Sequence, residues 1–157
     1  MDSNSVREWA AALVPYVAVF TAAWAIYTYR RAKKVEVARL QKQIFDDLFL
    51  SGKFNAIREA LDWDYSEKIG PVLELLETAS GEIGQADRTL LTELDNFLNL
   101  IEYVLYLEQD KKLLTAADRK ALLGYWIDVV GREPELRAYV ATYNYERLAV
   151  CLSAEKA

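Results

Sequence analysis

Histidine is absent from the chain, and cysteine occurs once, as Cys151. Without histidine there is no Ser-His or Cys-His nucleophile pair, no imidazole general base and no imidazole metal ligand. A single cysteine forms no internal disulfide, which fits a reducing compartment, and Cys151 reads as a small apolar residue on a helix. We therefore expect a protein that is not an enzyme and that uses no metal or cofactor.

Glycine and proline are also scarce, with six and three residues among 157. No segment alternates apolar and polar residues with a period of two, so we expect no β-sheet and an all-α fold. The net charge of -5 argues against direct binding of nucleic acid, whose phosphates require a basic surface. At 53% hydrophobic residues the chain can still build a compact core.

Charge is missing from one long stretch, "WAAALVPYVAVFTAAWAIYTY", which covers residues 9–29. About 20 apolar residues span a bilayer as a helix, so this length predicts a single transmembrane helix. Two alternatives are a cleaved secretion signal and a helix buried in a protein core or against a partner. A signal peptide would carry its basic residues before a shorter apolar region, whereas here the basic cluster follows. Abundant alanine, Pro15, Tyr16, Thr21 and Thr28 make insertion only modestly favourable.

The residues that flank this stretch predict its orientation. Excess positive charge marks the cytoplasmic side of a membrane helix. Residues 1–8 should therefore lie outside the bacterial inner membrane, and the residues after the helix on its cytoplasmic side. We expect 30–50 to form a juxtamembrane helix and 51–157 a cytoplasmic antiparallel helical bundle. The expected membrane-interface anchors are Trp9, Tyr27, Tyr29, Arg30, Arg31, Lys33 and Lys34. The four basic residues of this set should also touch anionic lipid head groups.

The two sides of the predicted membrane helix differ in bulk. Aromatic and large aliphatic residues recur along one side at helical spacing, and small or hydroxyl-bearing residues along another. Small residues let helices approach closely in lipid, so the second side is a candidate face for self-association or for lining a narrow opening. Its members are Val14, Ala18, Thr21, Ala25 and Thr28.

Beyond residue 50 the apolar periodicity predicts several helices. The strongest pattern, with apolar residues at i, i+3, i+4 and i+7, covers 86–109 and should form the centre of the core. A helix should begin at Thr115, capped by Asp118, and stop at Gly131. Shorter helices are expected over 54–61, over 71–78 and from Pro134 to about residue 152, with "DWDYSEKIGP" and "SGEIGQ" as loops.

Two groups of residues in the bundle invite a functional interpretation. Asp62 and Asp64 are a carboxylate pair, but nothing nearby supplies the further oxygens of a metal site, so a solvated loop is favoured. Aromatic residues are too numerous for a small bundle to bury, and exposed Tyr and Trp often anchor interfaces. The candidates for a protein interface are Trp63, Tyr65 and Tyr145.

The segment "LDNFLNLIEYVLYLEQDKKLLTAADRKALLGYWIDVV", with the N-terminal apolar helix and basic cluster, resembles the DUF4760-type family of small bacterial membrane-anchored helical proteins. The layout is also similar to that of the membrane accessory protein of type VI-B CRISPR systems. That resemblance implies helical domains that assemble into a membrane pore, in a defence role. The helical domain of that protein resembles the HEPN ribonuclease fold, which cuts RNA with an Arg and a His. Because this chain has no His, the resemblance implies no nuclease activity here.

Two functions are expected from these observations. The first is a non-enzymatic effector of bacterial anti-phage defence that forms homo-oligomers and perturbs or opens the inner membrane. The second is an adapter, in which the membrane helix only localises the bundle and the bundle binds and regulates a cytoplasmic protein. Exchange of the membrane helix for an unrelated anchor separates the two, because only the adapter keeps its activity. An enzyme is a third reading, and no constellation of residues supports it.

Overall fold

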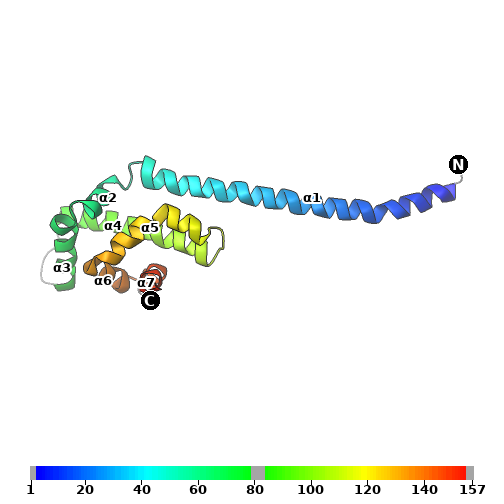
Figure 1. Cartoon of the computed structure of the whole chain (residues 1–157). Coiled ribbons are helices and arrows are strands. Elements are labelled where there is room, and N and C mark those ends of the chain that lie inside the picture. The colour runs from blue at the N-terminus through cyan, green and yellow to red at the C-terminus, as the bar shows by residue number, and fades with distance from the viewer. Residues whose placement is uncertain (1–2, 79–83, 155–157) are drawn as a thin grey trace. The chain divides into compact units, whose positions relative to one another are not determined.

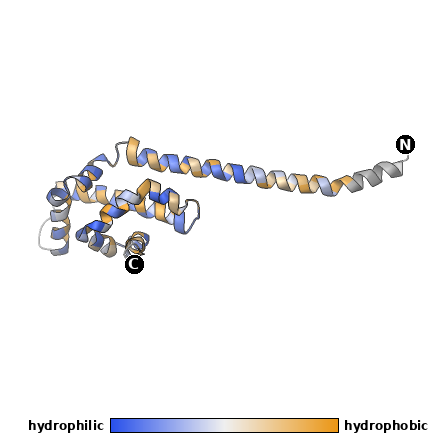
Figure 2. Cartoon of the chain, viewed as in Figure 1, coloured by the Kyte–Doolittle hydropathy of each residue, from blue (hydrophilic) through white to orange (hydrophobic). Residues whose placement is uncertain are grey.

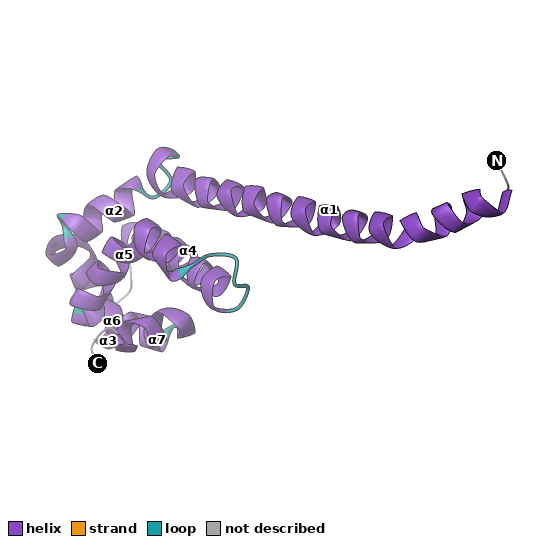
Figure 3. Cartoon of the chain, turned by 45° about the vertical axis from the view of Figure 1, so that its right-hand side comes forward, coloured by secondary structure: helices purple, strands orange, loops and turns teal. Residues whose placement is uncertain are grey.

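A computed structural model describes the backbone of residues 3–78 and 84–154, and the side chains of this part from Leu13 onward. Over these residues the chain is all-α and contains no strand (Figures 1 and 3). The expected fold class is therefore confirmed at this level. The chain divides into two units, residues 1–40 and residues 41–157, which we describe separately.

Helix α1 covers Ser3–Phe45 without a break. Pro15 lies inside it, so the helix lacks one backbone hydrogen bond there. From residue 13 to residue 29 the helix is mostly apolar in Figure 2, and charged residues follow at the basic cluster. The last turn passes into a π-helical turn, η1, at Asp46–Leu50, and Gly52 then adopts a positive φ of 71°. The expected helix over 30–50 is thus present, as the end of α1 followed by η1.

No helix among the described residues combines the length and the hydropathy needed to cross a membrane. The predicted transmembrane helix over 9–29 is therefore not borne out in this part of the chain. Pro15, Tyr16, Thr21 and Thr28 lower the mean hydropathy of the segment. Trp9, where the predicted span begins, lies outside the residues whose side chains the structure describes.

The second unit is a bundle of short helices around one long helix, α4, at Gln85–Gln109. Around it lie α2 (Asn55–Asp62), η2 (Tyr65–Ile69), α3 (Gly70–Thr78), α5 (Ala116–Arg132), α6 (Pro134–Thr142) and α7 (Glu146–Ala154). Helix α4 packs against α2, α5 and α7, while α6 packs against α3, α5 and α7. The prediction that 86–109 forms the central helix is confirmed.

The core of this unit is an aromatic cluster surrounded by leucine and isoleucine. The Phe97 ring is fully buried and meets the Phe54 ring edge-on at 5.6 Å and the Trp126 ring at 5.3 Å between centroids. Edge-to-face rings at such distances stabilise a fold beyond the area that they bury. Three helices, α2, α4 and α5, are tied at this point, since Phe54 directly precedes α2.

Helix boundaries follow the sequence signals in some places and not in others. Thr115 and Asp118 form the expected capping box, with hydrogen bonds of 3.2 Å and 2.8 Å to each other's backbone N–H groups. Gly131 does not stop α5, which continues to Arg132. The "DWDYSEKIGP" segment is not a loop, because η2 occupies half of it and its two ends belong to α2 and α3. Most of "SGEIGQ" lies outside the described residues.

We predict that Phe97→Ala lowers the free energy of unfolding by about 3–5 kcal/mol, because it removes a buried ring and leaves a cavity. The measurement is urea unfolding of the full chain followed by far-UV circular dichroism. Phe20→Ala is the matched control, since Phe20 is 70% exposed, and should change the value by less than about 0.5 kcal/mol. Equal effects of the two substitutions would contradict the assigned core.

Candidate functional site

The N-terminal part of α1 carries large apolar side chains on every side of the helix. Ten of them are 55% to 74% exposed. They are Leu13, Val14, Tyr16, Val17, Val19, Phe20, Trp24, Ile26, Tyr27 and Tyr29. Soluble monomers rarely expose continuous apolar surface of this kind, so it marks a site where lipid or protein covers the helix.

The polar groups on this helix are satisfied by the helix itself. The Thr21 hydroxyl donates to the carbonyl oxygen of Val17 at 2.8 Å, and the Thr28 hydroxyl lies 3.0 Å from the carbonyl oxygens of both Trp24 and Ala25. Back-bonding of this type lets a threonine enter an apolar environment without a lost hydrogen bond. The two hydroxyls therefore need no partner from a neighbouring chain.

The structure keeps the predicted difference between the sides of this helix. Phe20 and Trp24 stack at 6.5 Å between ring centroids, and Trp24 and Tyr27 lie 6.0 Å apart, so the bulky side forms an aromatic ladder. Every member of the small face, Val14, Ala18, Thr21, Ala25 and Thr28, is exposed. The anchors Tyr27, Tyr29, Arg30, Arg31, Lys33 and Lys34 are exposed as well, whereas Trp9 lies outside the described side chains.

A second exposed aromatic site lies on the bundle, where α2 ends. Trp63 is 83% exposed, and Tyr125 on α5 is 57% exposed. The Tyr125 hydroxyl donates to the carboxylate of Asp62 at 2.5 Å, and this hydrogen bond raises the pKa of Tyr125. Asp64 pairs with Lys68 at 2.6 Å. Trp63 is thus presented beside fixed polar groups, as interface anchors commonly are.

Two tyrosines that were predicted to lie at an interface form hydrogen bonds within the bundle. Tyr65 is partly buried and donates its hydroxyl to Glu135 at 3.0 Å. Tyr145 is only 6% exposed, and its hydroxyl donates to Asp95 at 2.8 Å. The expected interface is therefore unsupported at Tyr145, because the side chain fills the core between α6 and α7.

Asp95 is the acceptor for two tyrosines that come from distant parts of the chain. Its Oδ1 accepts from the Tyr139 hydroxyl at 2.7 Å and from the Tyr145 hydroxyl at 2.8 Å. Burial raises the pKa of both phenols, and the hydrogen bonds to the Asp95 carboxylate raise it further. This cluster ties α4 to α6 and to the start of α7.

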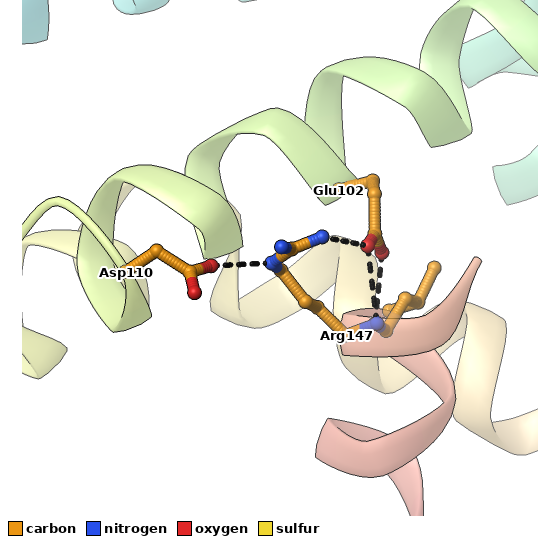
Figure 4. A network of polar contacts seen from close by, with 4 residues as sticks. Glu102, Asp110 and Arg147 are labelled. Atoms are coloured by element: carbon orange, nitrogen blue, oxygen red, sulfur yellow. Dashed lines mark hydrogen bonds and ion pairs between the residues drawn. The ribbon is translucent and has the colours of Figure 1, made fainter.

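A charged network fixes the start of α7 (Figure 4). The Glu102 carboxylate accepts from the backbone N–H groups of Arg147 at 3.0 Å and Leu148 at 2.9 Å, where the helix dipole favours negative charge. The Arg147 guanidinium bridges Glu102 at 3.1 Å and Asp110 at 2.7 Å. Glu102 thus occupies the helix N-terminus, so this end of α7 is closed to an external anion.

Arg58 has a position that the sequence did not predict. Its guanidinium lies 4.9 Å from the Phe49 ring centroid and 5.3 Å from that of Trp126, and it donates to the carbonyl oxygen of Leu48 at 2.8 Å. A cation between two rings is favoured when it is desolvated. Arg58 therefore ties η1 to the aromatic core.

The acidic residues of the described part of the chain do not gather into a metal-binding group. No group of three or more His, Cys, Asp or Glu in this part could hold a metal ion. Asp62 and Asp64 do not act as a pair, because they bind Tyr125 and Lys68 separately. The polar groups around Asp95 and Glu102 form hydrogen bonds with one another and hold neighbouring helices together.

Comparisons with protein-family models, with curated proteins and with solved structures found no match for this chain. The resemblance to DUF4760-type proteins and to the CRISPR accessory protein therefore stays an expectation.

We predict a loss of stability at alkaline pH that depends on the Asp95 cluster. The pKa of Tyr139 and of Tyr145 is raised above the ordinary value of 10.0. Their contribution to the free energy of unfolding is therefore complete below about pH 10 and is lost as the pH rises further. Urea unfolding at several values between about pH 8 and pH 11 should show a free energy of unfolding that changes little up to about pH 10 and declines above it in the wild type.

In a Tyr139→Phe/Tyr145→Phe variant the free energy of unfolding should be lower than in the wild type at neutral pH. It should then fall less steeply as the pH rises. Tyr103→Phe, at a half-exposed tyrosine outside the cluster, controls for the substitution itself. An unchanged slope in the double variant would show that these two hydroxyls are not held as described.

Proposed function

We propose that this chain is a non-enzymatic, membrane-anchored interaction protein, in which the apolar part of α1 is buried in lipid and the helical unit of residues 41–157 binds a protein partner. One observation carries the proposal: residues 13–29 expose apolar side chains around the whole helix, with both threonine hydroxyls satisfied internally. Lipid covers such a helix on all sides at once, which a single protein groove does not.

The basic cluster that follows supports the same assignment. Arg30, Arg31, Lys33 and Lys34 are all exposed and lie directly after Tyr27 and Tyr29. Aromatic residues followed by Lys and Arg are typical of the cytoplasmic edge of a membrane-inserted helix. On this proposal the bundle lies on the cytoplasmic side of the bacterial inner membrane.

The partner site that we propose on the bundle centres on Trp63. Its exposed indole is flanked by the carboxylates of Asp62 and Asp64, which are held by Tyr125 and Lys68. A large exposed aromatic side chain suits a protein partner that offers an apolar pocket.

Membrane anchoring is tested by placing charge in the apolar segment. Val17→Lys/Phe20→Lys should move the full chain from the membrane fraction to the supernatant after alkaline carbonate extraction, because each lysine near the bilayer centre costs about 2.5–3.5 kcal/mol. The matched control adds two lysines to apolar positions of the bundle that are 70% and 65% exposed, Leu50→Lys/Val150→Lys, and should stay with the membrane. Recovery of the wild type in the supernatant would overturn the proposal.

A second candidate is an effector that oligomerises and perturbs the membrane, as in anti-phage defence. The exposed small face at Val14, Ala18, Thr21, Ala25 and Thr28 favours it, because helices can pack closely there. Dye release from vesicles that contain the full chain should then fall in Ala18→Leu/Thr21→Leu and persist in Val19→Leu/Ala23→Leu, which alters other faces. A wild type that releases no dye favours the partner-binding function alone.

A further inference from the structure

Helices α6 and α7 form a hairpin with an open groove of about 420 Å³ between them. The two helices pack against each other, and each of them supplies one wall of the groove. Val140 from α6 and Leu152 from α7 are the buried residues of the lining, so they form its floor. The groove therefore lies wholly within the bundle and has an apolar base between two helical walls.

The walls of this groove are small and almost uncharged. Ala138 and Ala141 line it from α6, and Ala149 and Ser153 line it from α7. Among the described residues of the lining, Arg137 alone carries a charge. The water-facing side of a helix in a globular protein normally carries charged and polar residues, and packed helices approach more closely when the side chains at their contact are small. These walls are therefore suited to contact with another helix.

An exposed apolar side chain lies directly beside the groove. Val150 is 65% exposed and follows Ala149, which belongs to the wall on α7. It occupies the middle of α7, which begins at Glu146 and ends at Ala154. The same surface thus carries a protruding side chain and a recess. A two-fold interface brings the same patch of two copies together, so a patch with both features can pack against its own copy.

Charges at the two ends of the hairpin fit the same symmetry. Arg137 lines the groove together with Ser153, which places it beside the C-terminal end of α7. Glu146 is exposed and begins α7 at the opposite end. Neither Arg137 nor Glu146 belongs to the ion pairs formed among the described residues. A two-fold axis at Val150 reverses the direction of α7, so Glu146 of each copy comes to the end of the other copy where Arg137 lies.

We propose that the α6–α7 hairpin is a homodimer interface, in which the α7 helices of two copies cross at Val150 and pack at each other's groove. Two ion pairs, each between Arg137 of one copy and Glu146 of the other, fix the arrangement. The proposal goes beyond the proposed function, because it gives the bundle a surface for a second copy of this chain, apart from the site at Trp63. It does not depend on membrane anchoring, since all of its residues belong to the unit of residues 41–157.

The first test is disulfide cross-linking at the proposed axis. The full chain carries Val150→Cys in a Cys151→Ser background and is oxidised with copper phenanthroline in an excess of detergent micelles, so that copies meet only through their affinity for each other. We expect at least about tenfold more covalent dimer than in the control Leu75→Cys/Cys151→Ser, because contact at the axis raises the effective concentration of the second thiol. Leu75 lies on α3 and is half-exposed.

The second test reverses the charges of the proposed ion pairs. Arg137→Glu and Glu146→Arg should each raise the dissociation constant of the dimer by at least about tenfold, because a two-fold interface then brings like charges together twice. The combined variant Arg137→Glu/Glu146→Arg should restore most of the affinity. Arg88→Glu, at an exposed position on α4, makes the same charge change outside the interface and should leave the affinity unchanged. Analytical ultracentrifugation in density-matched detergent measures the dissociation constants.

Several outcomes would overturn the proposal. One is equal cross-linking at Val150→Cys and Leu75→Cys, or none at either. Another is a combined charge variant that keeps its helical circular dichroism and yet fails to recover the dimer. A dimer that charge reversal leaves unchanged, and that Ala18→Leu/Thr21→Leu removes, would place the contact on α1 instead. Carbonate extraction reads membrane anchoring separately, so a failure of the hairpin interface leaves the test of the proposed function intact.

Discussion

The proposed function depends on one constraint, which is that residues 13–29 of α1 expose apolar side chains along the length of a helix. Exposure of such a surface to water is unfavourable. Burial of one large apolar side chain stabilises a protein by about 1.5–3 kcal/mol relative to leaving that side chain exposed. The hydroxyls of Thr21 and Thr28 are bonded within the helix, so the tyrosines are the remaining hydroxyl-bearing residues of this stretch. The proposed lipid anchoring rests on this surface.

Charge divides along the chain in a way that agrees with this proposal. Residues 1–40 hold six of the 19 Lys and Arg and three of the 24 Asp and Glu, which leaves 13 basic and 21 acidic residues for 41–157. A basic helix is attracted to an anionic membrane, whereas an acidic unit is repelled from it. The acidic unit would then keep its exposed Trp63 surface available to a partner in the aqueous phase. Inside that unit, Arg147 forms an ion pair with Glu102, and Arg58 donates to the carbonyl oxygen of Leu48. These two arginines therefore stabilise contacts within the bundle.

Sequence reasoning succeeded where short-range patterns determine the structure. The i, i+3, i+4 spacing located α4, and the Thr115–Asp118 pair located the start of α5. It failed where distant residues decide the outcome. Gly131 lies in the last turn of α5, where Leu152 of α7 is 3.1 Å from the position that a Cβ atom would occupy, so a glycine fits this close approach. Tyr145 is buried because Asp95, 50 residues away, accepts its hydroxyl, and no local pattern reveals such a pair. Trp63 is exposed, and its place in a partner interface stays a prediction.

The most direct test of the central claim is a nitroxide scan of residues 13–29 in a Cys151→Ser background, with the full chain in vesicles. Collision rates with molecular oxygen and with a water-soluble nickel complex report whether each position faces lipid or water. Lipid around the whole helix predicts high oxygen and low nickel accessibility on every side of the helix, with nickel accessibility rising only at the membrane edge near residues 27–29. High nickel accessibility throughout, or on one side with a period of 3.6 residues, would contradict it.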